Sequence, residues 1–74
     1  MGKLPVISGD QFVKAVDHIG YNWDHTEGSH MILLNGNGRR IVVSRHKELG
    51  PGILRKLIRE AGISRTKFIT LLKK

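Results

Sequence analysis

This chain must build its hydrophobic core from only 74 residues and without covalent reinforcement, because it contains no cysteine. A chain of this length buries only about 60% of the surface that it exposes when unfolded, so its core is marginal. Neither disulfide bonds nor thiolate-bound metals can add to its stability. We therefore expect a single domain over residues 1–74, stabilised by well-capped helices packed on a sheet and by any partner chain that it binds.

The positive charge of the chain is concentrated in its second half. Residues 1–38 hold two basic and four acidic side chains, net −2, and residues 39–74 hold eleven basic and two acidic ones, net +9, which together give the overall +7. Such an asymmetry favours a polyanionic partner. Nucleic acid is preferred over an anionic membrane and over a merely solubilising surface, because a base-rich region is the electrostatic footprint of phosphate binding.

The sequence gives no indication of export or membrane insertion. No apolar run approaches the roughly 18 residues that span a bilayer. The first eight residues lack the apolar core of a signal peptide. The absence of cysteine also suits a reducing compartment. We expect a cytoplasmic protein with no membrane partner.

The N-terminal part of the chain predicts a helix with a clearly marked start. Ser8 is a good N-cap residue, and Gln11 stands three positions later, as in a capping box. Ile7 and Phe12 occupy the two positions of a hydrophobic staple. Apolar residues then recur with helical period until Gly20, which is suited to end the helix.

Three strands joined by two tight turns are predicted next, at residues 21–26, 30–34 and 39–44. The turns fall at residues 27–29 and 35–38. The second turn contains Asn35-Gly36, a pair that adopts positive φ at low cost and is a strong hairpin signal. Consecutive strands joined in this way form an antiparallel meander.

The second predicted strand is apolar at four consecutive positions, 31–34. A sheet with one solvated face would alternate instead. Two helices can cover only one face of a three-stranded sheet. The other face is therefore either covered within the monomer or forms an apolar patch, extended by Tyr21 and Trp23, that meets a partner.

The C-terminal part predicts two further helices. Pro51 is well placed in the first turn of one helix, Gly62 ends it, and Ser64 caps a shorter last helix. The buried stripe of the first of these helices is expected to comprise Ile53, Leu54, Leu57, Ile58 and Ala61. The predicted fold class is α+β, with a three-stranded antiparallel sheet and the helices packed on one of its faces.

Four histidines are the candidate chemical groups: His18, His25, His30 and His46. They lie in different predicted elements without the close ligand spacings of a zinc site. His18 is expected on the solvated side of its helix. His30 stands at the entrance of a strand, directly after a turn. An imidazole there could exchange protons near neutral pH, although a structural role is the common alternative for a lone histidine in a strand.

The sequence also resembles a known family in a series of short motifs. They are Lys3-Leu4-Pro5, Ser8-Gly9, Gly28-Ser29-His30, Gly38-Arg39-Arg40, Glu48-Leu49, Pro51-Gly52, Leu54-Arg55, Ile58-Arg59 and Ala61-Gly62-Ile63-Ser64. A single Gly-Ser-His would be weak evidence. The motifs in this order, in a chain of this length, resemble the HicA toxins of bacterial and archaeal toxin–antitoxin pairs.

This resemblance implies a fold similar to the double-stranded-RNA-binding domain, in the order α-β-β-β-α. It implies a ribonuclease that cleaves messenger RNA, with His30 as the key residue and with Gly28 and Ser29 as the loop that poses it. It further implies an antitoxin of the HicB type as partner. Because the histidines lack the spacing of a metal site, we expect a metal-independent endoribonuclease without a cofactor, in which His30 is a general acid or base. Residues 44–47 are more compact than the corresponding family segment, so no role is carried over to His46.

The basic residues suggest where RNA would bind. Arg55, Lys56 and Arg59 fall opposite the buried stripe of their helix and are expected to contact phosphates. Arg39, Arg40 and Arg45 form a second candidate set. A fold does not fix a function, so the alternative is a non-catalytic RNA-binding module on the same fold. An interaction protein with an acidic partner is a third interpretation.

Overall fold

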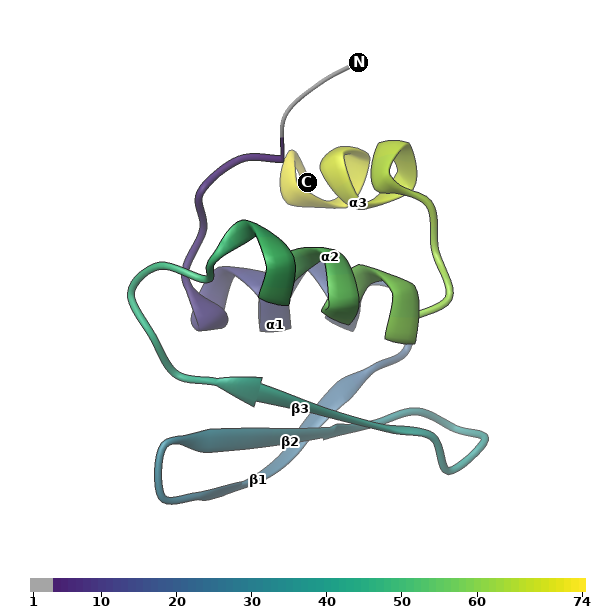
Figure 1. Ribbon diagram of the computed structural model, residues 1–74. Coiled ribbons are helices and arrows are strands. Elements are labelled where there is room, and N and C mark those ends of the chain that lie inside the picture. Colours follow the sequence, from purple (N-terminus) through teal and green to yellow (C-terminus); the bar gives the residue numbers. More distant parts are fainter. Residues whose placement is uncertain (1–3) are drawn as a thin grey trace.

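The computed structural model describes residues 4–74, so Lys3 of the opening motif lies outside the described residues. The elements are, in order, α1 (Gly9–Asp17), β1 (Asn22–Glu27), β2 (His30–Leu34), β3 (Arg40–Ser44), α2 (Pro51–Glu60) and α3 (Arg65–Leu72). The strands form one antiparallel sheet in the order β1-β2-β3, and the three helices lie on one side of it (Figure 1). The predicted fold class is confirmed. None of the helices within residues 4–74 has the length and hydropathy to cross a membrane.

The start of α1 is fixed by the predicted capping box. The Gln11 backbone N–H donates to the Ser8 hydroxyl at 3.1 Å, and the Ser8 backbone N–H donates to the Gln11 side-chain oxygen at 2.9 Å. These two bonds satisfy donors that a helix start leaves open. At the other end, Gly20 has a φ of +96°, the left-handed conformation expected after a helix.

The strand register gives the sheet two different faces. Met31, Leu33, Ile41 and Val43 point to the helices and belong to the hydrophobic core. Because side chains alternate along a strand, the intervening residues of β2 and β3 point away from the helices, on what we call the outward face. On β2 the outward positions are His30, Ile32 and Leu34, and on β3 they are Arg40, Val42 and Ser44.

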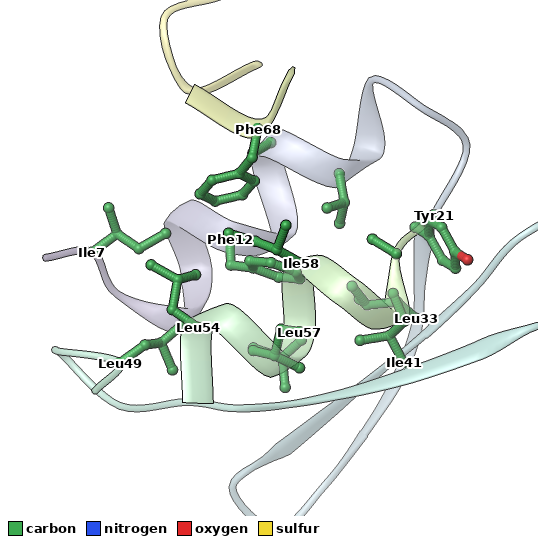
Figure 2. Close-up of a cluster of buried hydrophobic side chains, with 14 of the residues drawn as sticks. Ile7, Phe12, Tyr21, Leu33, Ile41, Leu49, Leu54, Leu57, Ile58 and Phe68 are labelled. Atoms are coloured by element: carbon green, nitrogen blue, oxygen red, sulfur yellow. The ribbon is translucent and has the colours of Figure 1, made fainter. Parts of the chain in front are cut away.

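The core lies between the sheet and the helices and is entirely apolar. Within residues 4–74 no polar or charged residue is buried. Figure 2 shows the side chains of α1, α2 and α3 meeting, and the Phe12 and Phe68 rings lie 5.5 Å apart between centroids. Helix α3 packs on α1 and adds a further layer above the two helices that cover the sheet (Figure 1).

Three side chains differ from their predicted positions. Ile53 is 51% exposed instead of buried, whereas its predicted stripe partners on α2 are buried. It lies in the first turn of α2, at the edge of the sheet, where the helix has no further layer to pack on. Tyr21 precedes β1 and lies in the core with 3% of its surface exposed, so it does not extend an exposed patch. Trp23 is exposed, but it pairs with Leu33 and borders α1 on the helix side of the sheet, so it does not extend the outward face either.

The turn between β2 and β3 closes a hairpin, as predicted, but the positive φ is not in the predicted Asn35-Gly36 pair. Gly38 has a positive φ of +81°, whereas neither Asn35 nor Gly36 does. The Asn35 side chain instead accepts the backbone N–H groups of Asn37 and Arg39, each at 2.9 Å. The loop is therefore longer than a two-residue turn, and only its last glycine needs the left-handed conformation.

The beginning of α1 docks tightly against the segment that leaves β3. The Gly9 backbone N–H donates to the His46 carbonyl at 2.9 Å, and the Leu49 N–H donates to the Ile7 carbonyl at 2.7 Å. Gly9 is buried there, and a Cβ atom at this position would lie 2.3 Å from the Ser44 carbonyl oxygen. The absence of a side chain at residue 9 thus allows α1 to reach the end of β3.

Candidate active site

The turn that precedes His30 explains the Gly-Ser-His motif in physical terms. Strand β1 extends to Glu27, one residue beyond the prediction, so only Gly28 and Ser29 lie between paired strands. Gly28 has a φ of +60° at the first central position, which is the conformation that a type II′ hairpin turn requires. The Ser29 carbonyl accepts the Arg45 backbone N–H at 2.7 Å and so fastens the turn to the end of β3.

His30 is the first residue of β2 and is solvent-exposed on the outward face. Its paired neighbours across the sheet are Glu27 on β1 and Ser44 on β3. Within residues 4–74 no hydrogen bond or ion pair engages its imidazole. Both ring nitrogens of His30 are therefore accessible, on a backbone held by strand pairs on either side.

A second histidine, which the sequence analysis did not single out, lies on the neighbouring strand. His25 Nδ1 is 2.6 Å from an Asp24 carboxylate oxygen, and its Nε2 is 2.9 Å from a Glu27 carboxylate oxygen. These hydrogen bonds, that to Asp24 first, raise the pKa of His25 above its ordinary value. Both ring nitrogens of His25 are therefore engaged in hydrogen bonds, whereas those of His30 have no partner within residues 4–74.

The contacts of His25 arise from a bulge in β1. The register shifts between Trp23 and His25, so Asp24 is an extra residue without a partner on β2. A bulge changes the direction in which neighbouring side chains point. The acidic residues on either side of His25 were visible in the sequence, but the bulge that brings them together was not.

Two of the six predicted RNA-binding residues, Arg40 and Lys56, meet in a groove between β3 and α2. The volume of this groove is about 420 Å³. Its other lining residues are Val42, Ser44, Ile53, Leu57 and the acidic Glu60. Ser44 is the residue that pairs with His30. The groove therefore runs from the neighbour of His30 along β3 and is lined by two basic side chains and one acidic one.

The other four predicted RNA-binding residues lie elsewhere. Arg39 donates to the Glu60 backbone carbonyl at 3.3 Å and so interacts with the C-terminal end of α2. Arg45 lies near α1, with its Nε 3.8 Å from an Asp10 oxygen. Arg55 and Arg59 are exposed on α2 but do not line the groove. The structure thus distributes the predicted set over several surfaces.

Neither of the two remaining histidines lines the groove beside β3. His18 is the exposed C-cap residue of α1, as predicted. His46 is exposed, and its backbone carbonyl accepts the Gly9 N–H described above. Over residues 4–74 no three His, Asp or Glu side chains form a group with the geometry to hold a metal ion.

Comparison with known proteins gives one finding about the family. The sequence model of a family described as the HicA toxin of bacterial toxin–antitoxin systems matches residues 9–63. This range contains α1, the whole sheet and α2, and so includes the turn, His30 and the groove. A comparison with curated proteins finds no match.

Proposed function

Because the chain belongs to the HicA toxin family of toxin–antitoxin systems, we propose that it is a metal-independent endoribonuclease that cleaves messenger RNA, with His30 as its general acid and base. The observation that carries this proposal is the exposed, unpartnered imidazole of His30 beside a tight turn. Gly28 and Ser29 serve as the loop that poses it. Residues 1–74 act as one ribonuclease domain.

The proposed reaction needs only proton transfer and stabilisation of charge. A neutral His30 ring nitrogen takes the proton of a ribose 2′-hydroxyl, and that oxygen forms a bond to the adjacent phosphorus. The bond from phosphorus to the 5′-oxygen breaks, and this oxygen takes a proton from the imidazolium. The products are a 2′,3′-cyclic phosphate and a 5′-hydroxyl. Basic side chains stabilise the negative charge on the phosphate oxygens.

The groove beside β3 is the proposed path for the RNA backbone. Arg40 and Lys56 would contact phosphates there, and Arg55 and Arg59 would add attraction from the exposed side of α2. Arg45 and Arg39 belong to the same candidate set, but Arg39 already contacts the end of α2. Phosphate contacts position an RNA chain without reading its sequence.

We propose that an acidic antitoxin of the HicB type inhibits the protein by covering this site. Val42 and Ile53 are large apolar residues that remain 41% and 51% exposed, and both line the groove beside β3. Ile32 also points to the outward face but is only 6% exposed. The exposed apolar patch is therefore smaller than the apolar run at residues 31–34 predicted. Opposite charge would speed association with the basic face.

Hydrogen exchange of the protein with and without the antitoxin tests this mode of inhibition. Amides of residues 28–34 and of β3 should exchange more slowly in the complex, because the partner covers them. Slower exchange only in α1 and α3 would mean that inhibition acts from a distance instead.

The proposed reaction is tested by incubating the purified protein with an unstructured RNA in the presence of EDTA. Cleavage should continue at an unchanged rate, because an imidazole and not a metal ion transfers the protons. It should yield 2′,3′-cyclic phosphate ends, because the ribose 2′-oxygen is the nucleophile. Loss of cleavage in EDTA and its recovery with Mg²⁺ or Zn²⁺ would contradict metal independence. Binding of RNA without any cleavage would favour the non-catalytic RNA-binding module instead.

A further inference from the structure

Trp23 is the most exposed large aromatic side chain of the described residues, and its position is fixed. It lies on β1, and 55% of its surface is exposed. Its indole Nε1 donates to the Thr26 hydroxyl at 2.9 Å. A tryptophan that only completed a core would be buried, whereas this ring is held in one place with much of its surface open to solvent.

The ring borders a groove of about 440 Å³ between the sheet and α1. Lys14 and Arg45 contribute positive charge to the lining, and Asp10 contributes one negative charge. Thr26 and Met31 form part of the lining and are paired across β1 and β2. The next pair along these strands is Glu27 with His30. The groove therefore lies one strand pair from the proposed catalytic residue, on the helix side of the sheet, whereas His30 points to the outward face.

The same groove is joined to the Gly28-Ser29 turn through Arg45. The Arg45 backbone N–H binds the Ser29 carbonyl, while the Arg45 side chain lines the groove. An RNA chain that passes His30 at the turn would meet the groove on the other side of the turn. Its phosphates would find Lys14 and Arg45 there, and a base would find the Trp23 ring.

We propose that Trp23 stacks against an unpaired nucleobase of the RNA that flanks the cleaved bond. Aromatic side chains bind splayed bases by stacking, because every base has a π-face, and neighbouring cations hold the backbone. A base within a duplex is already stacked and cannot enter this groove. This inference rests on the proposed function for the identity of the ligand, and it specifies a single-stranded substrate.

Trp23 is the only tryptophan in the chain, so its fluorescence reports directly on this site. The experiment uses His30→Ala protein, which leaves the probe uncut, and an eight-residue oligouridine. We expect the oligouridine to quench the fluorescence. An oligomer of the same length with abasic positions and a self-complementary RNA duplex should both quench much less. Equal quenching by the abasic oligomer, or none by oligouridine, would overturn the proposal.

Substitutions test the ring itself, with binding followed by the anisotropy of a labelled oligouridine. Trp23→Leu should weaken binding by about tenfold or more, the typical loss of one stacked base, and Trp23→Phe should restore most of it. Val6→Leu, at an exposed apolar residue that lines neither groove, is the matched control and should change little. Thermal unfolding of each variant shows whether the fold is kept. Leucine and phenylalanine variants that bind equally would contradict stacking.

These outcomes separate this inference from the proposed function. Cleavage by wild-type protein together with unchanged binding by Trp23→Leu would refute stacking and leave the ribonuclease proposal intact. Quenching by oligouridine in a protein that never cleaves RNA would refute the ribonuclease proposal and leave stacking intact.

Discussion

Replacing His30 with alanine is expected to reduce RNA cleavage by at least about 100-fold while leaving the fold unchanged. General acid–base catalysis by a positioned side chain contributes typically about 10²–10⁴-fold to a rate. The His30 side chain is exposed and makes no hydrogen bond within residues 4–74, so its removal should not disturb the sheet. The rate is measured on a labelled RNA, and circular dichroism checks the fold.

Two other histidines provide matched controls for His30→Ala. His25→Ala removes an exposed imidazole from the neighbouring strand, one whose nitrogens are held by carboxylates. His46→Ala removes an exposed side chain beyond the end of β3. Both variants should retain cleavage within a few-fold of wild type. A folded His30→Ala protein with wild-type activity would end the catalytic role of this residue, and a large loss in either control would identify a second proton-transferring group.

Replacing Gly9 with alanine is expected to destabilise the fold strongly. The added Cβ would lie 2.3 Å from the Ser44 carbonyl oxygen, which is backbone and cannot rotate away. Forcing extra atoms into a packed site costs typically about 1–3 kcal/mol. For a domain of this size each kcal/mol lowers the melting temperature by roughly 4–8 °C. We expect a fall of roughly 10 °C, measured by thermal unfolding.

Gly52→Ala is the matched control for Gly9→Ala. Gly52 also lies in the first turn of a helix, but nothing lies within 4 Å of a Cβ added there, and its φ is not positive. Alanine favours a helix over glycine, so the melting temperature should stay the same or rise slightly. If the two variants melted at the same temperature, α1 would not dock against β3 as described here.

Local signals in the sequence predicted most of the fold because the groups that interact are close along the chain. The capping pair Ser8 and Gln11 and the first-turn proline Pro51 act within one helical turn, so the sequence shows them directly. Ile53 was wrongly placed in the core because helical period identifies an apolar stripe but not how far the sheet extends beneath it. Tyr21 was misplaced because a strand boundary moved by one residue.

The candidate site was only partly predictable for the same reason. His30 stands next to its turn glycine in the sequence, so the motif and its geometry are both local. The approach of Lys56 to Arg40 depends on how α2 lies along β3, which no spacing in the sequence reveals. The acidic partners of His25 depend on a bulge, and a bulge leaves no mark on the pattern of apolar residues.

The one-sided placement of the helices has a consequence for how such a protein can evolve. The core cluster lies on the helix side of the sheet, and among the outward positions of β2 and β3 only Ile32 is buried. Selection for folding therefore acts mainly on the helix side, whereas the proposed catalytic residue His30 and the proposed antitoxin contact Val42 lie on the outward face. Substitutions around the exposed Val42 can change what the sheet binds at little expense in stability. A toxin and its inhibitor can consequently diverge together from their relatives, one compatible exchange at a time, while the scaffold beneath them stays the same.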